Sequence, residues 1–215
     1  YGPWTHGGWH NADYEGLGDR KFGENLSRYF MEKIEYPFFR YYLEGKGRRP
    51  EPVYLFASGS EEWQVMEKWP ADGIDYTPLY LSENSSLSFD QPVELESSAT
   101  YVSDPLSPVP FMADASRRNN AYMVADQTFA SLRSDVLTYT SPVIEETLKL
   151  HGPLQVRLDL AISLEDADIV VKFIDVHPDG YQMLVRGDVF PIRYRYAYDR
   201  PVKANPGEIL HIDFT

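Results

Sequence analysis

The histidines are the first candidates for chemistry, because imidazole is the side chain whose charge changes near neutral pH. The sequence contains five histidines and no cysteine. His6 stands between Gly2-Pro3 and Gly7-Gly8. We interpret Tyr1 as the end of a buried strand, so His6 lies on the loop that follows this strand. Glycines allow close approach of backbone to a substrate, and α/β enzymes keep catalytic groups on loops that follow strands. His6 is therefore our candidate catalytic residue.

A metal site is the alternative interpretation of the same region. His6 and His10 are four residues apart and Asp13 follows, and a histidine pair at that spacing on a helix can bind zinc. Gly7-Gly8 between them disfavours a helix, and no glutamate stands where a general base would be needed. We therefore expect no metal and no cofactor.

Two other groups are expected to be structural. Glu165, Asp166 and Asp168 form an acidic cluster, but it lacks the glycine and the distal glutamate of a calcium loop, so we predict a solvated turn. The following histidines lie in or beside predicted strands and are expected to have no catalytic role: His151, His177 and His211.

No nucleophile can be recognised in the chain. G-x-S-x-G is absent, and the nearest string, Ala57-Ser58-Gly59-Ser60, lacks the flanking glycines of a nucleophile elbow. Asp13 and Asp19 are too close to His6 in sequence to be assigned as the carboxylate of a triad. A histidine base needs both a nucleophile and an orienting carboxylate for acyl transfer. The chain thus offers at most half of such a site.

Charge and length narrow the classes of partner. The 215 residues fit one domain or two small ones, and 33 acidic against 20 basic side chains give a net charge of −13. Such a surface repels phosphate backbones, so no nucleic acid partner is expected. No apolar run approaches the roughly 20 residues that span a bilayer, so no membrane is expected either. The chain begins without Met, which we interpret as a piece of a longer or processed protein, periplasmic or secreted, with its signal upstream.

The spacing of apolar residues divides the chain into two regions with different predicted structure. Apolar residues at helical spacing predict a helix over 24–44, with a break near Pro37 and an end at Gly45 and Gly47. The string V-Y-L-F-A-S at 53–58 is apolar on both faces and predicts a strand buried between layers. A helix followed by such a strand is typical of an α/β sheet.

From about residue 73 the pattern predicts strands and turns. Alternation over 155–164 and the run at 169–176 predict two strands, and Pro178-Asp179-Gly180 predicts a turn after the second. Short strands separated by turns are typical of a β-sandwich or barrel, and prolines predict an extended loop over 101–112. Further strands are expected at 78–82, 86–89, 135–140, 143–150, 181–186, 189–198 and 208–214.

Several motifs together resemble one family. G-P-W-T-H-G-G-W at 2–9 resembles the catalytic-histidine loop of the cocaine esterase/X-Pro dipeptidyl-peptidase family of α/β-hydrolases, and it is most similar to the branch of α-amino-acid ester hydrolases and glutaryl cephalosporin acylases. The resemblance continues in Y-V-S-D-P-L-S-P-V-P-F at 101–111 and in D-A-D-I-V-V-K-F-I-D-V-H-P-D-G at 166–180. It covers almost the whole chain in order.

The resemblance implies a fold and a role for each part. It places His6 on the family's general base and makes residues 1–72 the end of the hydrolase domain, with its last helix and strand. Residues 73–215 would be a jelly-roll β-sandwich, truncated at its C-terminal side, so the fold class is mainly β. The nucleophile and the carboxylate would lie upstream, and the substrate would be a small ester or amide, or an X-Pro peptide. Relatives in this branch assemble into multimers, which implies a homo-oligomer.

A second class of function stays open from the residues alone. The chain could be a non-catalytic β-sandwich that binds a carbohydrate, a peptide or a partner subunit. Tyr194, Tyr196 and Tyr198 alternate in the sequence, and on one strand face they would form an aromatic strip. Packing in a core or interface is the more ordinary interpretation of that strip.

Overall fold

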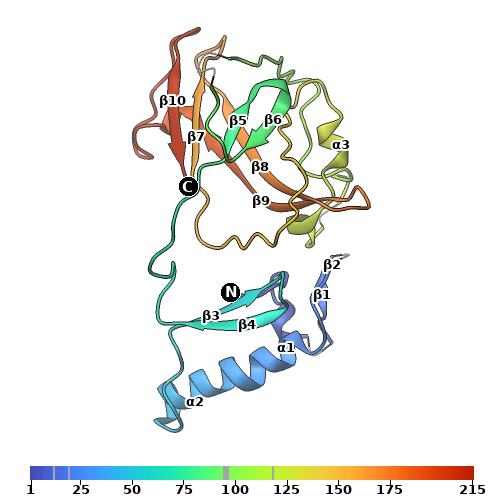
Figure 1. The fold of residues 1–215 in the computed structure, drawn as a ribbon. Coiled ribbons are helices and arrows are strands. Elements are labelled where there is room, and N and C mark those ends of the chain that lie inside the picture. Colours follow the sequence, from blue (N-terminus) through green and yellow to red (C-terminus); the bar gives the residue numbers. More distant parts are fainter. Residues whose placement is uncertain (12, 19, 94–96, 118) are drawn as a thin grey trace. The chain divides into compact units, whose positions relative to one another are not determined.

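The computed structural model describes residues 1–11, 13–18, 20–93, 97–117 and 119–215 (Figure 1). These residues form two compact units, which are described separately below. The first unit combines Tyr1–Leu150 with Val176–Met183, and the second combines His151–Asp175 with Leu184–Thr215.

Strands are the prevailing elements after residue 75, which confirms the predicted change to a β-rich chain. In the described part of that region, the longest α-helix is the four-residue α3 (Thr128–Ser131), and a 3₁₀ turn (Tyr122–Val124) precedes it. The described residues contain no helix with the length and apolar character needed to cross a bilayer.

The predicted helix is present over Leu26–Glu44, in three parts (Figure 1). α1 (Leu26–Tyr29) runs into a π-helical segment (Phe30–Glu35), and α2 (Tyr36–Glu44) follows with Pro37 in its first turn. Proline lacks an N–H group and its ring collides with the carbonyl four residues earlier, so a widened π turn before it accommodates both effects. Gly45 (φ 67°) ends the helix, as predicted, and its N–H donates to the carbonyl of Tyr41 over 3.1 Å.

The strand after the helix differs from its prediction. β3 (Val53–Ala57) pairs antiparallel with β4 (Glu62–Met66), and Phe56 is the one residue of β3 that is fully buried. The expected strand buried on both faces is therefore wrong for the described structure, because a strand is buried between layers only when other elements cover both of its faces. The apolar run is a property of the side chains and does not supply that cover.

Tyr1 extends this sheet on the other edge of β3. The Tyr1 amino group donates to the carbonyl of Tyr54 over 2.7 Å, and the N–H of Phe56 donates to the carbonyl of Tyr1 over 3.0 Å. In a parallel pair, one residue forms its two hydrogen bonds with the residues on either side of its partner. Tyr54 and Phe56 flank Leu55, so Tyr1 is paired with Leu55 in parallel. Tyr1, the helix and β3 thus have the connectivity of a β-α-β crossover.

The core of the first unit lies around β3 and α1. A two-residue ribbon, β1 (Gly16–Leu17) with β2 (Arg20–Lys21), precedes the helix. The buried apolar side chains of this core are those of Leu17, Phe22, Leu26, Phe56 and Val124, with Trp63, Met123 and Met183 packed against them. Segments far apart in sequence therefore contribute to one cluster.

Two predicted strands are absent from the described structure. β5 (Tyr80–Ser82) and β6 (Ser86–Ser88), joined by a 3₁₀ turn at Glu83–Ser85, form as expected, but 135–140 contributes only a parallel bridge between Thr140 and Ser86. Residues 143–150 have no strand, and the Val143 side chain is 88% exposed. Alternation selects a face, whereas a strand also needs a neighbouring edge to pair with. The loop over 101–112 is irregular, as its prolines predict.

The second unit is built on paired strands. β7 (Val156–Leu160) and β10 (Leu210–Phe214) are antiparallel, with Ile212 opposite Leu158. β8 (Asp168–Val176) and β9 (Gln182–Pro191) form a second two-stranded sheet. One cluster of buried apolar side chains in this unit is formed by Phe190, Ile192, Ala204, Leu210 and Ile212.

The turn between β8 and β9 is the one that the sequence predicts. Gly180 has φ 90° and donates its N–H to the carbonyl of His177 over 2.9 Å. The described residues pair in five two-stranded sheets. A jelly roll consists of two facing four-stranded sheets, so that part of the predicted fold class stays a prediction.

The predicted strand over 189–198 ends early, so the aromatic strip considered as an alternative does not form. β9 ends at Pro191, and a 3₁₀ turn (Ile192–Tyr194) follows, so Tyr194, Tyr196 and Tyr198 do not alternate along a strand. The chain folds back here because the Arg195 guanidinium donates to three backbone carbonyls within reach of this turn. Those hydrogen bonds replace the ladder that a longer strand would need.

Candidate active-site loop

His6 lies at the tip of a tight turn. The N–H of Gly8 donates to the carbonyl of Thr5 over 2.9 Å, and Gly7 has φ 79° and ψ −5°. These angles are those of the third residue of a type II β-turn, a position that requires positive φ and hence favours glycine. His6 occupies the second position, where its side chain is exposed. The turn therefore presents the imidazole to its surroundings.

The turn is fixed on both sides by polar contacts. The N–H of Thr5 donates to the hydroxyl oxygen of Tyr14 over 2.9 Å. The hydroxyl of Ser27, which is 0% exposed in α1, donates to the carbonyl of Gly8 over 3.0 Å. A buried hydrogen bond of this kind is costly to lose, because the partner is left without water. The helix thus holds the histidine turn in place.

Gly8 is expected to tolerate substitution less well than Gly7. A Cβ at Gly8 would lie 2.9 Å from the Tyr14 ring and 3.0 Å from the Cβ of Trp4, whereas none of the described atoms lies within 4 Å of a Cβ at Gly7. Gly8→Ala should lower the free energy of unfolding by about 2 kcal/mol through overpacking. Gly7→Ala should cost about 1 kcal/mol through its positive φ alone.

Thermal unfolding of the two variants checks this order. Gly59→Ala, which meets open space in the turn between β3 and β4, is the matched control and should be neutral. A Gly8→Ala protein as stable as Gly7→Ala would contradict the packing argument.

Within the described ranges, the His6 imidazole has one ring neighbour. Trp9 lies with its ring centroid 6.0 Å from that of His6 and an interplanar angle of 89°. Among the described residues, none forms a hydrogen bond or an ion pair with the His6 ring. The orienting carboxylate and the nucleophile of a triad are therefore not supplied by the described part of the chain.

The alternative metal ligands do not converge. The Nε2 atom of His10 lies 3.5 Å from Oε1 of Glu35, and the N–H of Asp13 is turned to the Asn11 side chain. The described residues bring no three His, Asp or Glu side chains together as ligands. Asp19 lies outside the described residues. Ser58 and Ser60 belong to the turn between β3 and β4, which is not a nucleophile elbow.

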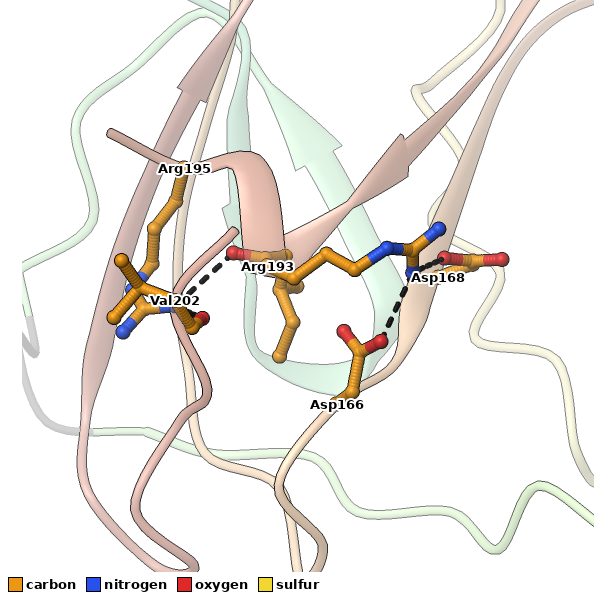
Figure 2. A network of polar contacts seen from close by, with 6 residues as sticks. Asp166, Asp168, Arg193, Arg195 and Val202 are labelled. Carbon is orange, nitrogen blue, oxygen red and sulfur yellow. Dashed lines mark hydrogen bonds and ion pairs between the residues drawn. The ribbon is translucent and has the colours of Figure 1, made fainter. Parts of the chain in front are cut away.

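The acidic cluster in the second unit is neutralised by basic side chains. Arg193 lies 2.9 Å from Asp166 and 3.0 Å from Asp168 (Figure 2), and Lys203 pairs with Glu165. Hydrogen bonds to Asp166 and Asp168 raise the pKa of the Arg193 guanidinium, and the hydrogen bond to Glu165 raises the pKa of Lys203. The cluster therefore joins the turn before β8 to the segment after β9.

Arg195 completes this network, and its loss should be costly. Its guanidinium donates to the carbonyls of Ile192 (3.1 Å), Val202 (2.7 Å; Figure 2) and Lys203 (3.1 Å). Arg195→Met should lower the free energy of unfolding by about 2 kcal/mol, because partly buried carbonyls lose their donor.

Urea unfolding of the full-length protein measures that loss. Arg200→Met, at an exposed arginine of the same segment, should stay within about 0.5 kcal/mol of the unsubstituted protein. Arg195→Lys should recover only part of the stability, since an ammonium cannot reproduce the fork. Equal midpoints for Arg195→Met and Arg200→Met would refute the bridging role.

The other histidines are placed among structural contacts. Nδ1 of His211 on β10 lies 2.5 Å from Oδ1 of Asp159, which is opposite to it on β7. The His177 ring is 5.3 Å from that of Tyr181 across the β8–β9 turn, and His151 is exposed at the start of the second unit. These positions are apart in the sequence and on different elements from the His6 turn.

Comparison with known proteins identifies the family. Residues 36–215 match the family model described as the X-Pro dipeptidyl-peptidase C-terminal non-catalytic domain. The chain belongs to this family. The matched range begins inside the helix, at the start of α2, and His6 precedes it.

Relatives of the C-terminal non-catalytic domain are hydrolases. A cocaine esterase of Rhodococcus sp. (strain MB1 Bresler) is 29% identical over 98% of this chain and 38% of its own length. The structure of an aminopeptidase from a marine sediment archaeon (Thaumarchaeota archaeon) is 30% identical with a TM-score of 0.90, over 99% of this chain and 38% of that one. An α-amino acid ester hydrolase structure is 32% identical with a TM-score of 0.86, over 95% and 37%. The chain therefore spans less than two fifths of these relatives.

Sequence reasoning missed the residues that hold the loop. Tyr14 and Ser27 both lie after the end of the G-P-W-T-H-G-G-W motif at Trp9, and the fold brings them to the turn. No periodic pattern distinguishes them from surface polar residues. A serine beside Leu26, on the buried side of the helix, is the one signal that was available. The sequence suggests that Gly8 lets a substrate approach the backbone, whereas in the structure Gly8 leaves room for Tyr14 and Trp4.

Proposed function

We propose that this chain is the C-terminal part of a serine hydrolase that cleaves small esters or amides, or X-Pro peptides, through an acyl-enzyme, with His6 as the general base. The observation that carries the proposal is the His6 turn, which presents an exposed imidazole on a backbone fixed by Ser27 and Tyr14. The relatives are an esterase, an aminopeptidase and an ester hydrolase, and each of these activities breaks a bond to an acyl carbon.

The connectivity around His6 supports this role. The turn follows Tyr1, which pairs in parallel with β3, so His6 stands at the end of a strand within a β-α-β crossover. In open α/β sheets, catalytic groups gather beyond the carboxyl ends of such strands. A nucleophile and a carboxylate from the remainder of the full-length protein would meet His6 at that edge.

The roles of the two parts of the chain differ in this proposal. Residues 1–72 would be the end of the hydrolase domain, and 73–215 a jelly-roll domain that helps to wall the active site. The non-catalytic description of the family matched over 36–215 supports the second role. The alternative function is a binding module for a carbohydrate, peptide or partner subunit. It would concern residues 73–215, so it does not conflict with a catalytic His6.

The chemistry assigned to His6 is proton transfer. As the general base, the neutral imidazole would take the proton of the serine hydroxyl as the oxygen attacks the acyl carbon. The imidazolium would then give the proton to the leaving alcohol or amine. The same ring would thus serve both steps, first at the serine oxygen and then at the leaving oxygen or nitrogen.

The full-length protein provides the test. It should react with a fluorophosphonate probe and hydrolyse at least one of an α-amino acid p-nitrophenyl ester, a β-lactam acyl amide and an Xaa-Pro p-nitroanilide, with a burst of the first product. These 215 residues alone should hydrolyse none of them above background, since they hold no recognisable nucleophile. A full-length protein inert to the probe and to all three substrates would overturn the proposal.

A further inference from the structure

A row of four side chains runs from the helix to the candidate base. Glu35 in the π-helical segment lies 3.5 Å from His10, measured from Oε1 to Nε2. The His10 ring is 5.6 Å from that of Trp9 at 66°, and the Trp9 ring is 6.0 Å from that of His6 at 89°. Each of these ring pairs has the tilted or edge-to-face geometry that aromatic rings prefer.

We infer that Trp9 is the positioning residue of His6, with the Glu35–His10 pair bracing the indole; this rests on the proposed function of His6. Among the described residues, none holds the His6 ring by a hydrogen bond. The position of His6 in a turn fixes its backbone, but rotation about χ1 and χ2 is still open to an exposed side chain. In the described part of the chain the indole of Trp9 is the one ring against which the imidazole packs.

The local backbone explains why Trp9 is the residue that meets His6. The Thr5–Gly8 turn runs directly into the 3₁₀ turn at Gly8–His10, where the N–H of His10 donates to the carbonyl of Gly7 over 3.1 Å. The left-handed Gly7 joins the two turns, and the rings of His6 and Trp9, three positions apart, lie in contact across it. His6 and Trp9 have that spacing, and Gly7-Gly8 between them leaves no side chain to intervene.

The brace gives the indole an orientation that the turn alone would not. Trp9 is partly buried and lies between the two histidine rings, and His10 is tethered to a carboxylate on the helix. The same helix also holds the turn through Ser27. One element therefore fixes both the backbone of the turn and the indole. A base held in one orientation loses less in reaching the geometry of proton transfer, and small misplacements can lower rates by about 10²-fold.

Trp9 variants of the full-length protein test the inference. Trp9→Leu should lower kcat by about 10- to 100-fold while KM changes less than about twofold, because the indole orients the base and does not bind substrate. Trp9→Phe, which retains a ring, should recover most of kcat. His10→Ala and Glu35→Gln should each lower kcat by a few fold, in the same direction.

A spectroscopic readout separates this inference from the proposed function. In full-length protein with ¹³C-labelled histidine, the His6 ring signal, assigned by its loss in His6→Ala, should be shifted by the indole ring current and should move in Trp9→Leu. If His6→Ala keeps full activity, the proposed function fails, whereas the ring signal still reports the contact. Unchanged kcat in Trp9→Leu, an equal loss in Trp9→Phe, or a His6 signal that does not move would overturn the positioning role.

Discussion

Replacing His6 by alanine in the full-length protein is expected to lower kcat/KM roughly 10³-fold or more, because acyl transfer then lacks its general base. The melting temperature should change little. The His6 side chain is exposed, and its one ring contact is with Trp9. Steady-state kinetics and thermal unfolding of the same preparation measure the two effects together.

His211→Ala is the matched control for this experiment. Its imidazole is also exposed and pairs with Asp159 on the opposite strand, so its loss removes a histidine without touching the turn. Turnover should stay near that of the unsubstituted protein, since an exposed pair contributes little to stability. If His6→Ala retained near-native turnover, or lost it only together with its fold, the assignment of His6 as base would be wrong.

Replacing Ile192 by alanine should produce the largest loss of stability. Ile192 is 0% exposed, packs with Phe190, Leu210 and Ile212, and donates its N–H to the carbonyl of Ala167 over 3.0 Å. Removing three carbons from such a site costs about 2–5 kcal/mol, the transfer term plus the cavity left behind. Amide hydrogen exchange on β7 and β10 in the full-length protein should report the loss, because it resolves this unit from the rest.

Val189→Ala supplies the comparison at a neighbouring position. Its side chain on β9 is 49% exposed, so the substitution should cost well under about 1 kcal/mol. Ile192→Val should fall between the two, at about 1 kcal/mol. Exchange rates that rise as much for Val189→Ala as for Ile192→Ala would show that burial at 192 does not stabilise this unit.

The elements that the sequence predicts well are those with local causes. Apolar side chains at helical spacing define the helix, Pro37 marks the start of α2, and Gly45 ends it. The turn at Pro178-Asp179-Gly180 follows from residues that favour it wherever they occur. In each case the determining interactions lie within a few residues, so a linear pattern contains them.

The elements that it predicts poorly depend on partners. Residues 143–150 contain β-branched and apolar side chains that suit a strand, yet no described edge pairs with them. Tyr194, Tyr196 and Tyr198 alternate in the sequence, but the Arg195 hydrogen bonds take the backbone out of the sheet. Periodicity records which face a side chain prefers and carries no information on which segment lies beside it.

In the candidate site too, some features have local causes and others depend on distant partners. His6 and the glycines after it can be found from the sequence, since a turn with positive φ at its third position selects Gly7. The contacts that fix the turn come from Tyr14 and Ser27, which the fold and not the motif brings to it. The orienting part played by the helix could not be read from residue types alone.

The direct passage from the π-helical segment into α2 has a practical consequence for anyone who dissects this protein. The family match begins at residue 36, where the π-helical segment passes into α2. A polypeptide started there would keep Phe56 but discard Leu17, Phe22 and Leu26, three of the five buried side chains in the first core. Such a product should expose Phe56 to water and precipitate. We therefore expect that the start of the family match, at residue 36, is not a position at which the chain can be cut and still fold.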